Sequence, residues 1–189
     1  MPIKKPTAAD ENKHRPDEDR EGIALCLSGG GYRAALFHLG SLRRLNELGI
    51  LSKLDAVSSV SGGSITNGLL AVQWEELEDS ESEGRFEKFD DLVAGPLHEF
   101  CGEDIRTDLT LEKLNPSNWT RLAGRDESIT DLLVDAYERK LPLDATLDVL
   151  PEKPRFHICA TNLETGVNWT YGPDPDDPSS VGMGDYLCG

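Results

Sequence analysis

Apolar runs and repeated leucines divide the chain into an alternation of strands and helices. Residues 22–27 are continuously apolar, which is typical of a strand buried on both faces of a parallel sheet. Residues 32–48 carry leucine at positions 36, 39, 42, 45 and 48, which predicts a helix with one apolar face. Gly49 is expected to cap this helix, with Ile50 folding back against its last turn. A second strand is expected at residues 55–60.

The strand–helix–strand order implies that the first two strands pair in parallel through a right-handed crossover. A second helix is expected over residues 64–77. The amphipathic stretch 86–100 contains Pro96, which either opens a new helix or kinks this one. Residues 128–141 predict another amphipathic helix. The sequence therefore predicts an α/β fold, a three-layer sandwich whose mainly parallel central sheet has helices on both faces.

The C-terminal third predicts two further strands, at residues 155–160 and 167–171, joined through a turn at Gly166. The segments 78–84 and 173–180 are acidic and are expected to be solvated loops. The second of these lacks the glycine and final glutamate of a calcium-binding loop.

The chain is expected to form one domain over residues 21–189, preceded by a disordered polar tail over residues 1–20. The tail has no apolar core of a signal peptide, and no apolar run reaches the ~20 residues of a membrane-spanning helix. Any contact with membranes is therefore expected to be peripheral.

The formal net charge is −16, from 35 acidic and 19 basic residues. This charge argues against nucleic acid as a partner and against strong electrostatic binding to anionic lipid. The four cysteines are far apart and form no C-x-x-C pair, so neither a disulfide framework nor a metal site is expected. Cys26 and Cys159 are interpreted as buried, reduced thiols in strands of a cytoplasmic protein. The oligomeric state is left open.

Ser61 is the candidate nucleophile. It stands between a predicted strand and a predicted helix, and Gly62 and Gly63 follow it. A serine flanked by small residues at such a tight turn is typical of a nucleophile elbow, although Ser59 stands where the usual G-x-S-x-G has its first glycine. The helix N-terminus would offer N–H groups to an anion that forms at the hydroxyl.

A run of three glycines, Gly29, Gly30 and Gly31, follows the first predicted strand, with Arg33 just beyond. Consecutive glycines allow backbone N–H groups to converge on a phosphate or on the oxyanion of an acyl-transfer intermediate. Arg33 would steady this loop or pair with a lipid phosphate. The combination of this run with Ser61 is more specific than either motif alone.

Together these motifs resemble the patatin-like phospholipase family. Gly29-Gly30-Gly31-Tyr32-Arg33-Ala34 is similar to its oxyanion loop, the following residues 38–47 are similar to its next helix, and Ser61 is similar to its elbow serine. A weaker similarity covers residues 156–166. The resemblance implies hydrolysis of a carboxylic ester in a lipid or phospholipid, without metal or organic cofactor.

The resemblance also implies a Ser-Asp dyad whose aspartate lies in a D-G-[GA] motif. No aspartate of this chain is followed by glycine, and Asp185 is the nearest by position only. We interpret the chain as the front part of a longer enzyme, in preference to a relative that has lost its base. The chain alone is expected to be inactive or nearly so, because a serine hydroxyl needs a base.

Other interpretations remain open from the sequence. A histidine base would have to be one of His14, His38, His98 and His157. For His38 a packed or capping role is favoured, and His157 is expected to be half-buried in its strand. The run Gly29-x-Gly31-x-x-Ala34 also fits a dinucleotide-binding motif, but the second strand lacks the acidic residue expected at its end. A non-catalytic interaction module on the same fold is the second rival.

Overall fold

The computed structural model describes residues 21–102, 150–164, 168–173 and 181–185, with isolated positions between 137 and 147 and at 166. The predicted tail at residues 1–20, the predicted helix at 128–141 except for isolated positions, and most of the loop at 173–180 lie outside this description. No helix within these ranges is both long enough and apolar enough to cross a bilayer.

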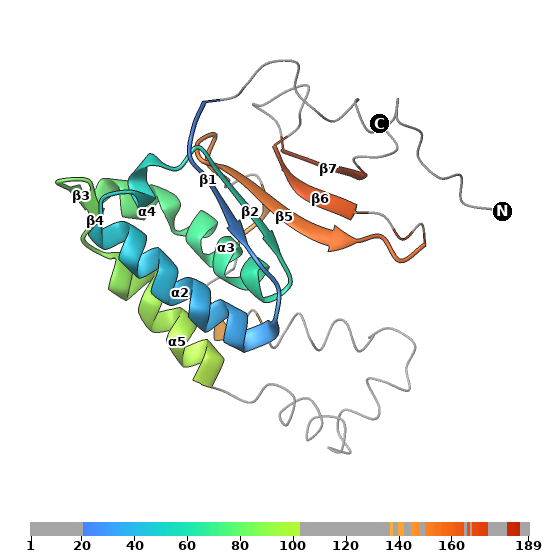
Figure 1. Ribbon diagram of the computed structural model, residues 1–189, viewed down its shortest axis with the longest axis horizontal. Helices are drawn as coiled ribbons and strands as arrows, with labels where there is room; N and C mark the ends of the chain where they lie inside the picture. Colours follow the sequence, from blue (N-terminus) through green and yellow to red (C-terminus); the bar gives the residue numbers. More distant parts are fainter. Residues whose placement is uncertain are drawn as a thin grey trace.

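A five-stranded sheet runs through the described structure in the order β1-β2-β5-β6-β7 (Figure 1). Its strands are β1 (Ala24–Leu27), β2 (Ala56–Val60), β5 (Arg155–Thr161), β6 (Asn168–Pro173) and β7 (Val181–Asp185). The predicted parallel pairing of β1 with β2 is confirmed, and β2 also pairs in parallel with β5. β6 and β7 continue the sheet in antiparallel pairing. The architecture is mixed α/β, with parallel strands where the chain makes its first two crossovers.

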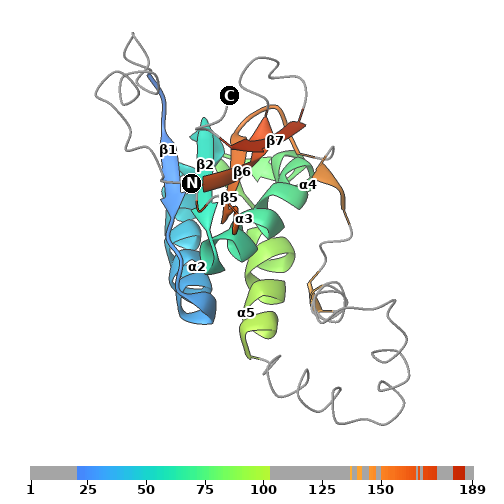
Figure 2. The ribbon, with the colours of Figure 1, turned by 90° about the vertical axis from the view of Figure 1, so that its right-hand side faces the viewer.

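Over residues 21–102, the α-helices that accompany the sheet are α2 (Gly31–Glu47), α3 (Gly62–Val72), α4 (Trp74–Asp79) and α5 (Gly95–Gly102). Figures 1 and 2 show these helices gathered on one side of the sheet, and α3 packs on β1, β2 and β5. Among the described residues, these helices cover one face of the sheet. The expected helix at residues 64–77 is divided at Gln73 into α3 and α4.

Shorter elements connect these parts. A 3-10 turn, η1 (Leu51–Lys53), precedes β2, and a hairpin of β3 (Glu81–Ser82) and β4 (Arg85–Phe86) follows α4. The expected solvated loop at 78–84 thus contains the end of α4 and a short strand. A π-helical turn, η2 (Asp90–Ala94), leads into α5, whose second residue is Pro96. Pro96 therefore opens a new helix, where its missing N–H leaves no intrahelical bond unmade.

The C-terminus of α2 has the predicted cap. Gly49 has φ 63°, and its N–H donates to the carbonyl of Asn46 at 2.9 Å. The N–H of Ile50 donates to the carbonyl of Leu45 at 2.9 Å. This pair of bonds is the Schellman motif, which ends a helix at a glycine in the left-handed conformation.

The expectation of one leucine face on α2 is wrong in part. Leu39 and Leu42 are buried, but Leu36 and Leu48 are 40% and 52% exposed. Residues three apart on an α-helix point in directions that differ by about 60°, because a full turn takes 3.6 residues. Five leucines at this spacing are therefore spread around most of the helix surface. Ala35 and His38 complete the buried face instead.

The expectation that the first strand is buried on both faces is also wrong. Leu25 and Leu27 face the helices, whereas Ala24 and Cys26 are exposed. Cys26 is therefore not the buried thiol expected from its apolar surroundings, and Cys159 is only half-buried. Cys26 pairs with Ser58, and Cys159 pairs with Val60. Ser58 and Val60 are two residues apart on β2 and therefore point to the same face. Both cysteines thus lie on the face of the sheet that the described helices leave open.

An aromatic cluster closes the core between the sheet and the helices. The ring of Trp74 makes edge-on contacts with Phe86 and Phe156, at centroid distances of 5.2 and 5.6 Å. Tyr32 makes a similar contact with Phe100 of α5 at 5.4 Å. The contact between Tyr32 and Phe100 anchors the first turn of α2 on α5 and so helps to position the glycines that precede this turn.

Candidate active site

Ser61 lies at the turn between β2 and α3, immediately before the first residue of the helix. Its backbone has φ 53° and ψ −121°. Non-glycine residues adopt such sparsely populated angles at a cost of about 1–3 kcal/mol, and they cluster at functional sites. The side chain of Ser61 is exposed. The structure thus has the strand, the strained serine and the helix start that a nucleophile elbow requires.

The glycine loop, formed by Gly29, Gly30 and Gly31, lies directly against Ser61. A Cβ atom built on Gly29 would stand 3.1 Å from the Cβ of Ser61 and 3.7 Å from its Oγ. Gly30 and Gly31 have φ of 142° and 63°, conformations that favour glycine. A Cβ on Gly31 would meet nothing within 4 Å, so this side of the loop is open.

The first turn of α3 packs on backbone rather than on side chains. A Cβ on Gly62 would overlap the carbonyl oxygen of Gly31. A Cβ on Gly63 would come within 2.8 Å of the carbonyl oxygen of Ser28. Both glycines are buried. The missing side chain of Gly62 allows the starts of α2 and α3 to meet, and that of Gly63 allows α3 to approach the end of β1. Two helix N-termini, each with unpaired N–H groups and a partial positive charge, therefore converge beside Ser61.

A buried polar network supports the turn from below. Ser59 is 2% exposed and Asn67 of α3 is fully buried. The Asn67 side-chain amide donates to Ser59 Oγ at 2.9 Å and to the carbonyl of His157 at 3.3 Å. Ser59 Oγ bonds in turn to Ser64 Oγ at 3.2 Å. Ser59 thus ties the elbow to both α3 and β5, a role that its place in the G-x-S-x-G spelling did not indicate.

The family model for Patatin-like phospholipase matches residues 25–178, which include β1, the glycine loop, the elbow and β5. The chain belongs to the patatin-like phospholipase family. A protein of Saccharomyces cerevisiae named "Putative meiotic phospholipase SPO1" is 32% identical over 147 residues. That alignment covers 77% of this chain and 22% of the yeast protein, so the chain spans about a fifth of that relative's length. No solved structure matches the chain significantly.

Among the described histidines of this patatin-like chain, His38 is already engaged and His98 lies on α5. His38 is 4% exposed, and its Nε2 lies 2.8 Å from the carbonyl oxygen of Ser28. This confirms its expected packing role, because it holds the end of β1 where the glycine loop begins. His98 is exposed on α5. His14 lies outside the described residues.

His157 is half-buried in β5, as expected. Burial lowers its pKa below the ordinary histidine value, and the nearby Arg155 lowers the pKa further. The register pairs His157 with Ser58, three residues before Ser61. At 3.3 Å per residue this is about 10 Å along the strand, which is beyond hydrogen-bond reach.

The described aspartates at the ends of the strands also lie away from the elbow. Asp185 is on β7, three strands from β2, which corresponds to about 14 Å at the usual spacing between strands. Asp55 precedes β2, at the end of the strand opposite Ser61. Lys153 lies 2.7 Å from this carboxylate, and its hydrogen bond, followed by that of the Ile23 N–H, lowers the pKa of Asp55.

Arg33 is exposed in the first turn of α2, two residues after the glycine loop. The ion pairs among the described residues involve other side chains. Its guanidinium is therefore available for an anion near the loop. Within the described ranges, no group of histidine, cysteine, aspartate or glutamate side chains could hold a metal ion.

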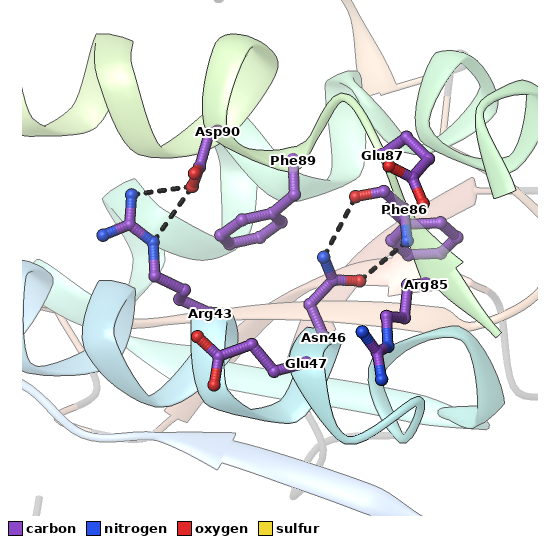
Figure 3. Close-up of a pocket in the computed structure, with 8 residues that line it drawn as sticks. All are labelled: Arg43, Asn46, Glu47, Arg85, Phe86, Glu87, Phe89 and Asp90. Atoms are coloured by element: carbon purple, nitrogen blue, oxygen red, sulfur yellow. Dashed lines mark hydrogen bonds and ion pairs between the residues drawn. The ribbon is translucent and has the colours of Figure 1, made fainter. Parts of the chain in front are cut away.

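A polar pocket of about 210 Å³ lies near the other end of α2 (Figure 3). Arg43 donates from Nε and from its terminal nitrogen to Asp90 Oδ1, at 3.0 and 2.7 Å. Asn46 exchanges two hydrogen bonds with the backbone of Phe86, at 3.0 and 2.8 Å. Glu47, Arg85, Glu87 and Phe89 complete the lining. These bonds fasten α2 to β4 and η2, and the pocket contains none of the candidate site residues.

Replacing Ser61 by glycine is expected to raise the free energy of unfolding by about 1 kcal/mol relative to Ser61→Ala. Glycine adopts φ 53° and ψ −121° at much lower cost, whereas alanine retains the strain. Thermal unfolding of the two variants, followed by circular dichroism, measures the difference. Equal melting temperatures would show that the elbow stores no strain at this position.

Proposed function

We propose that this chain supplies the nucleophile and the oxyanion-binding loop of a serine acyl hydrolase that cleaves a carboxylic ester in a lipid. The observation that carries the proposal is the exposed Ser61, held at positive φ with its side chain against Gly29. Family membership supports a lipid substrate and a role in lipid catabolism.

In the proposed reaction, Ser61 Oγ attacks the acyl carbon while its proton passes to an aspartate base. Backbone N–H groups of Gly29, Gly30 and Gly31 would hold the oxyanion of the tetrahedral intermediate. Collapse of this intermediate, with return of the proton from the aspartic acid to the leaving oxygen, expels the alcohol and leaves an acyl-enzyme, which water then hydrolyses. Gly62 supports the site by allowing the close contact of the two helix starts, and Gly63 by allowing α3 to pack on the end of β1.

Arg33 would bind a phosphate of the substrate or steady the loop, since a guanidinium recognises phosphate through paired hydrogen bonds. Neither a metal ion nor an organic cofactor takes part in this scheme. The aspartate base is proposed to lie outside the present sequence, which contains no D-G-[GA] motif.

The 189-residue chain alone is therefore expected to hydrolyse a soluble ester such as p-nitrophenyl butyrate at close to the rate in buffer. Removal of one partner of a catalytic serine typically costs about 10⁴–10⁶-fold in rate. The release of p-nitrophenol by the chain and by Ser61→Ala measures this rate. Robust turnover that Ser61→Ala abolishes would contradict the missing base, while supporting Ser61 as the nucleophile.

A non-catalytic interaction module is the second candidate. It is favoured by the placement of Asp55 and Asp185 away from Ser61. A fluorophosphonate probe separates the two candidates when applied to a longer polypeptide that contains a D-G-[GA] motif. The hydrolase predicts labelling that is lost in Ser61→Ala and retained in Ser41→Ala, a serine on α2. Absence of labelling would favour the module.

Dinucleotide binding is the remaining rival, and it is less consistent with the family. The second strand ends at Val60 and continues into Ser61, without an acidic residue for a ribose. Titration with NAD or FAD tests it directly. Saturable micromolar binding would overturn the preference for a hydrolase.

A further inference from the structure

The outward side of α2 carries an apolar stripe between two arginines. Arg33, Phe37, Gly40 and Arg44 follow one another at intervals of three or four residues and are all exposed. Such intervals place side chains in one row along a helix. Phe37 is 71% exposed, and Leu36 beside it is 40% exposed. We call these five residues the outer stripe of α2.

The outer stripe borders an open hollow. Gly40 contributes no side chain, and a Cβ built there would meet nothing within 4 Å. An open space of about 650 Å³ lies over it, lined by Leu36, Phe37 and Arg44 of the outer stripe and by Ser41 and Leu45. The described part of the chain therefore leaves a large aromatic side chain in water beside a shallow depression.

The charge of this helix is opposite to that of the whole chain. From Gly31 to Asn46, α2 contains Arg33, Arg43 and Arg44 and no carboxylate, and Glu47 is its sole acidic residue. The whole chain has a net charge of −16. Arginines that flank exposed aromatic and leucine side chains match a phospholipid interface, where the rings enter the acyl boundary and the guanidiniums meet phosphates.

The outer stripe also begins at the candidate active site. Gly31 of the glycine loop is the first residue of α2, and Phe37 stands six residues later, which is about 9 Å along the helix. A lipid layer that received Phe37 would thus lie within two turns of the helix end at which the glycine loop joins α2.

We propose that the outer stripe of α2 docks on a zwitterionic phospholipid surface and so presents Ser61 to ester bonds at that surface. This inference rests on the proposed lipid substrate. A zwitterionic surface is chosen because its phosphates accept hydrogen bonds from Arg33 without repelling the acidic remainder of the chain. Arg44 pairs with Glu47 at 2.7 Å, so a phosphate contact at Arg44 would replace or share that exposed ion pair. Insertion of Phe37 and Leu36 supplies the apolar part of the binding free energy.

Flotation of the 189-residue chain with vesicles tests the docking surface. Binding is expected to vesicles of phosphatidylcholine, and weaker binding, at low ionic strength, to vesicles that also contain phosphatidylserine. Phe37→Asp is expected to reduce the partition coefficient about ten-fold, which is what loss of one partly inserted side chain predicts. Leu163→Asp is the matched control, because Leu163 is 95% exposed on the turn between β5 and β6.

Arg44→Glu provides a second variant and is expected to weaken binding, whereas Arg85→Glu, an exposed arginine on β4, is not. Circular dichroism checks that each variant remains folded. No binding by the wild-type chain, or equal losses in Phe37→Asp and Leu163→Asp, would overturn the proposal. Sedimentation showing a dimer that Phe37→Asp dissociates would replace the lipid surface by a second copy of the chain.

The outcome is independent of the proposed chemistry. Ser61→Ala is expected to bind vesicles as the wild-type chain does, since the serine is not part of the outer stripe. Failure of vesicle binding therefore counts against the docking surface alone. Failure of labelling at Ser61 counts against the hydrolase, and vesicle binding could then still be measured.

Discussion

Replacing Gly62 by valine is expected to lower the free energy of unfolding by about 3 kcal/mol, which corresponds to a fall of roughly 6–12 °C in melting temperature for a chain of this size. A Cβ at this position would overlap the carbonyl oxygen of Gly31 and lie 2.8 Å from its nitrogen. Backbone forms both sides of the contact, so the clash is relieved only if the starts of α2 and α3 separate. Differential scanning calorimetry measures the effect.

Gly68→Ala is the matched control for Gly62→Val, because both glycines lie in α3. A Cβ on Gly68 would meet nothing within 4 Å. Alanine is favoured over glycine inside a helix, so this variant is expected to gain about 0.5–1 kcal/mol. If Gly62→Val melted together with the wild-type chain, the close contact between the glycine loop and the elbow would be wrong.

Replacing His38 by alanine is expected to cost about 2–4 kcal/mol of stability. The substitution removes the partner of the Ser28 carbonyl, 2.8 Å away, and leaves a cavity at a position that is only 4% exposed. Urea denaturation is expected to show a lower midpoint with an unchanged slope. Because Ser28 precedes Gly29, the glycine loop would also lose its fixed starting point.

His98→Ala is the control for this substitution, since His98 is exposed on α5. Its effect is expected to stay within about 0.5 kcal/mol, as is usual for surface positions. Equal losses in the two variants would indicate that His38 contributes no more than a surface histidine does.

The local elements around the site could be predicted because their signals are local. A glycine at position 49 was sufficient to predict the Schellman cap, and the strand–glycine–helix and strand–serine–helix patterns gave β1, α2, β2 and the start of α3. The order of these elements also predicted the parallel pairing of β1 with β2. The turn at Gly166 between β5 and β6 was correct for the same reason.

Other features could not be predicted because they depend on how the elements pack in space and not on the local sequence pattern. β7 has glycine at two of its five positions, 182 and 184, and glycine is a weak strand former. The strand forms because its backbone pairs with β6. Ser59 and Asn67 are eight residues apart, and only the packing of α3 on β2 and β5 brings them to 2.9 Å within the core.

The sequence by itself determined the family, the alternation of strands and helices, and the residues of the candidate site, because these depend on motifs of a few consecutive residues. Only the tertiary structure decided which sides of those elements are covered. Cys26 and Leu36 are apolar residues in apolar patterns, yet both are exposed, since burial depends on what packs against a side chain. The contact of Gly29 with Ser61 has a similar origin. Gly29 follows β1 and Ser61 follows β2, and the parallel pairing of these strands, which joins residues 32 apart in sequence, brings the two turns together.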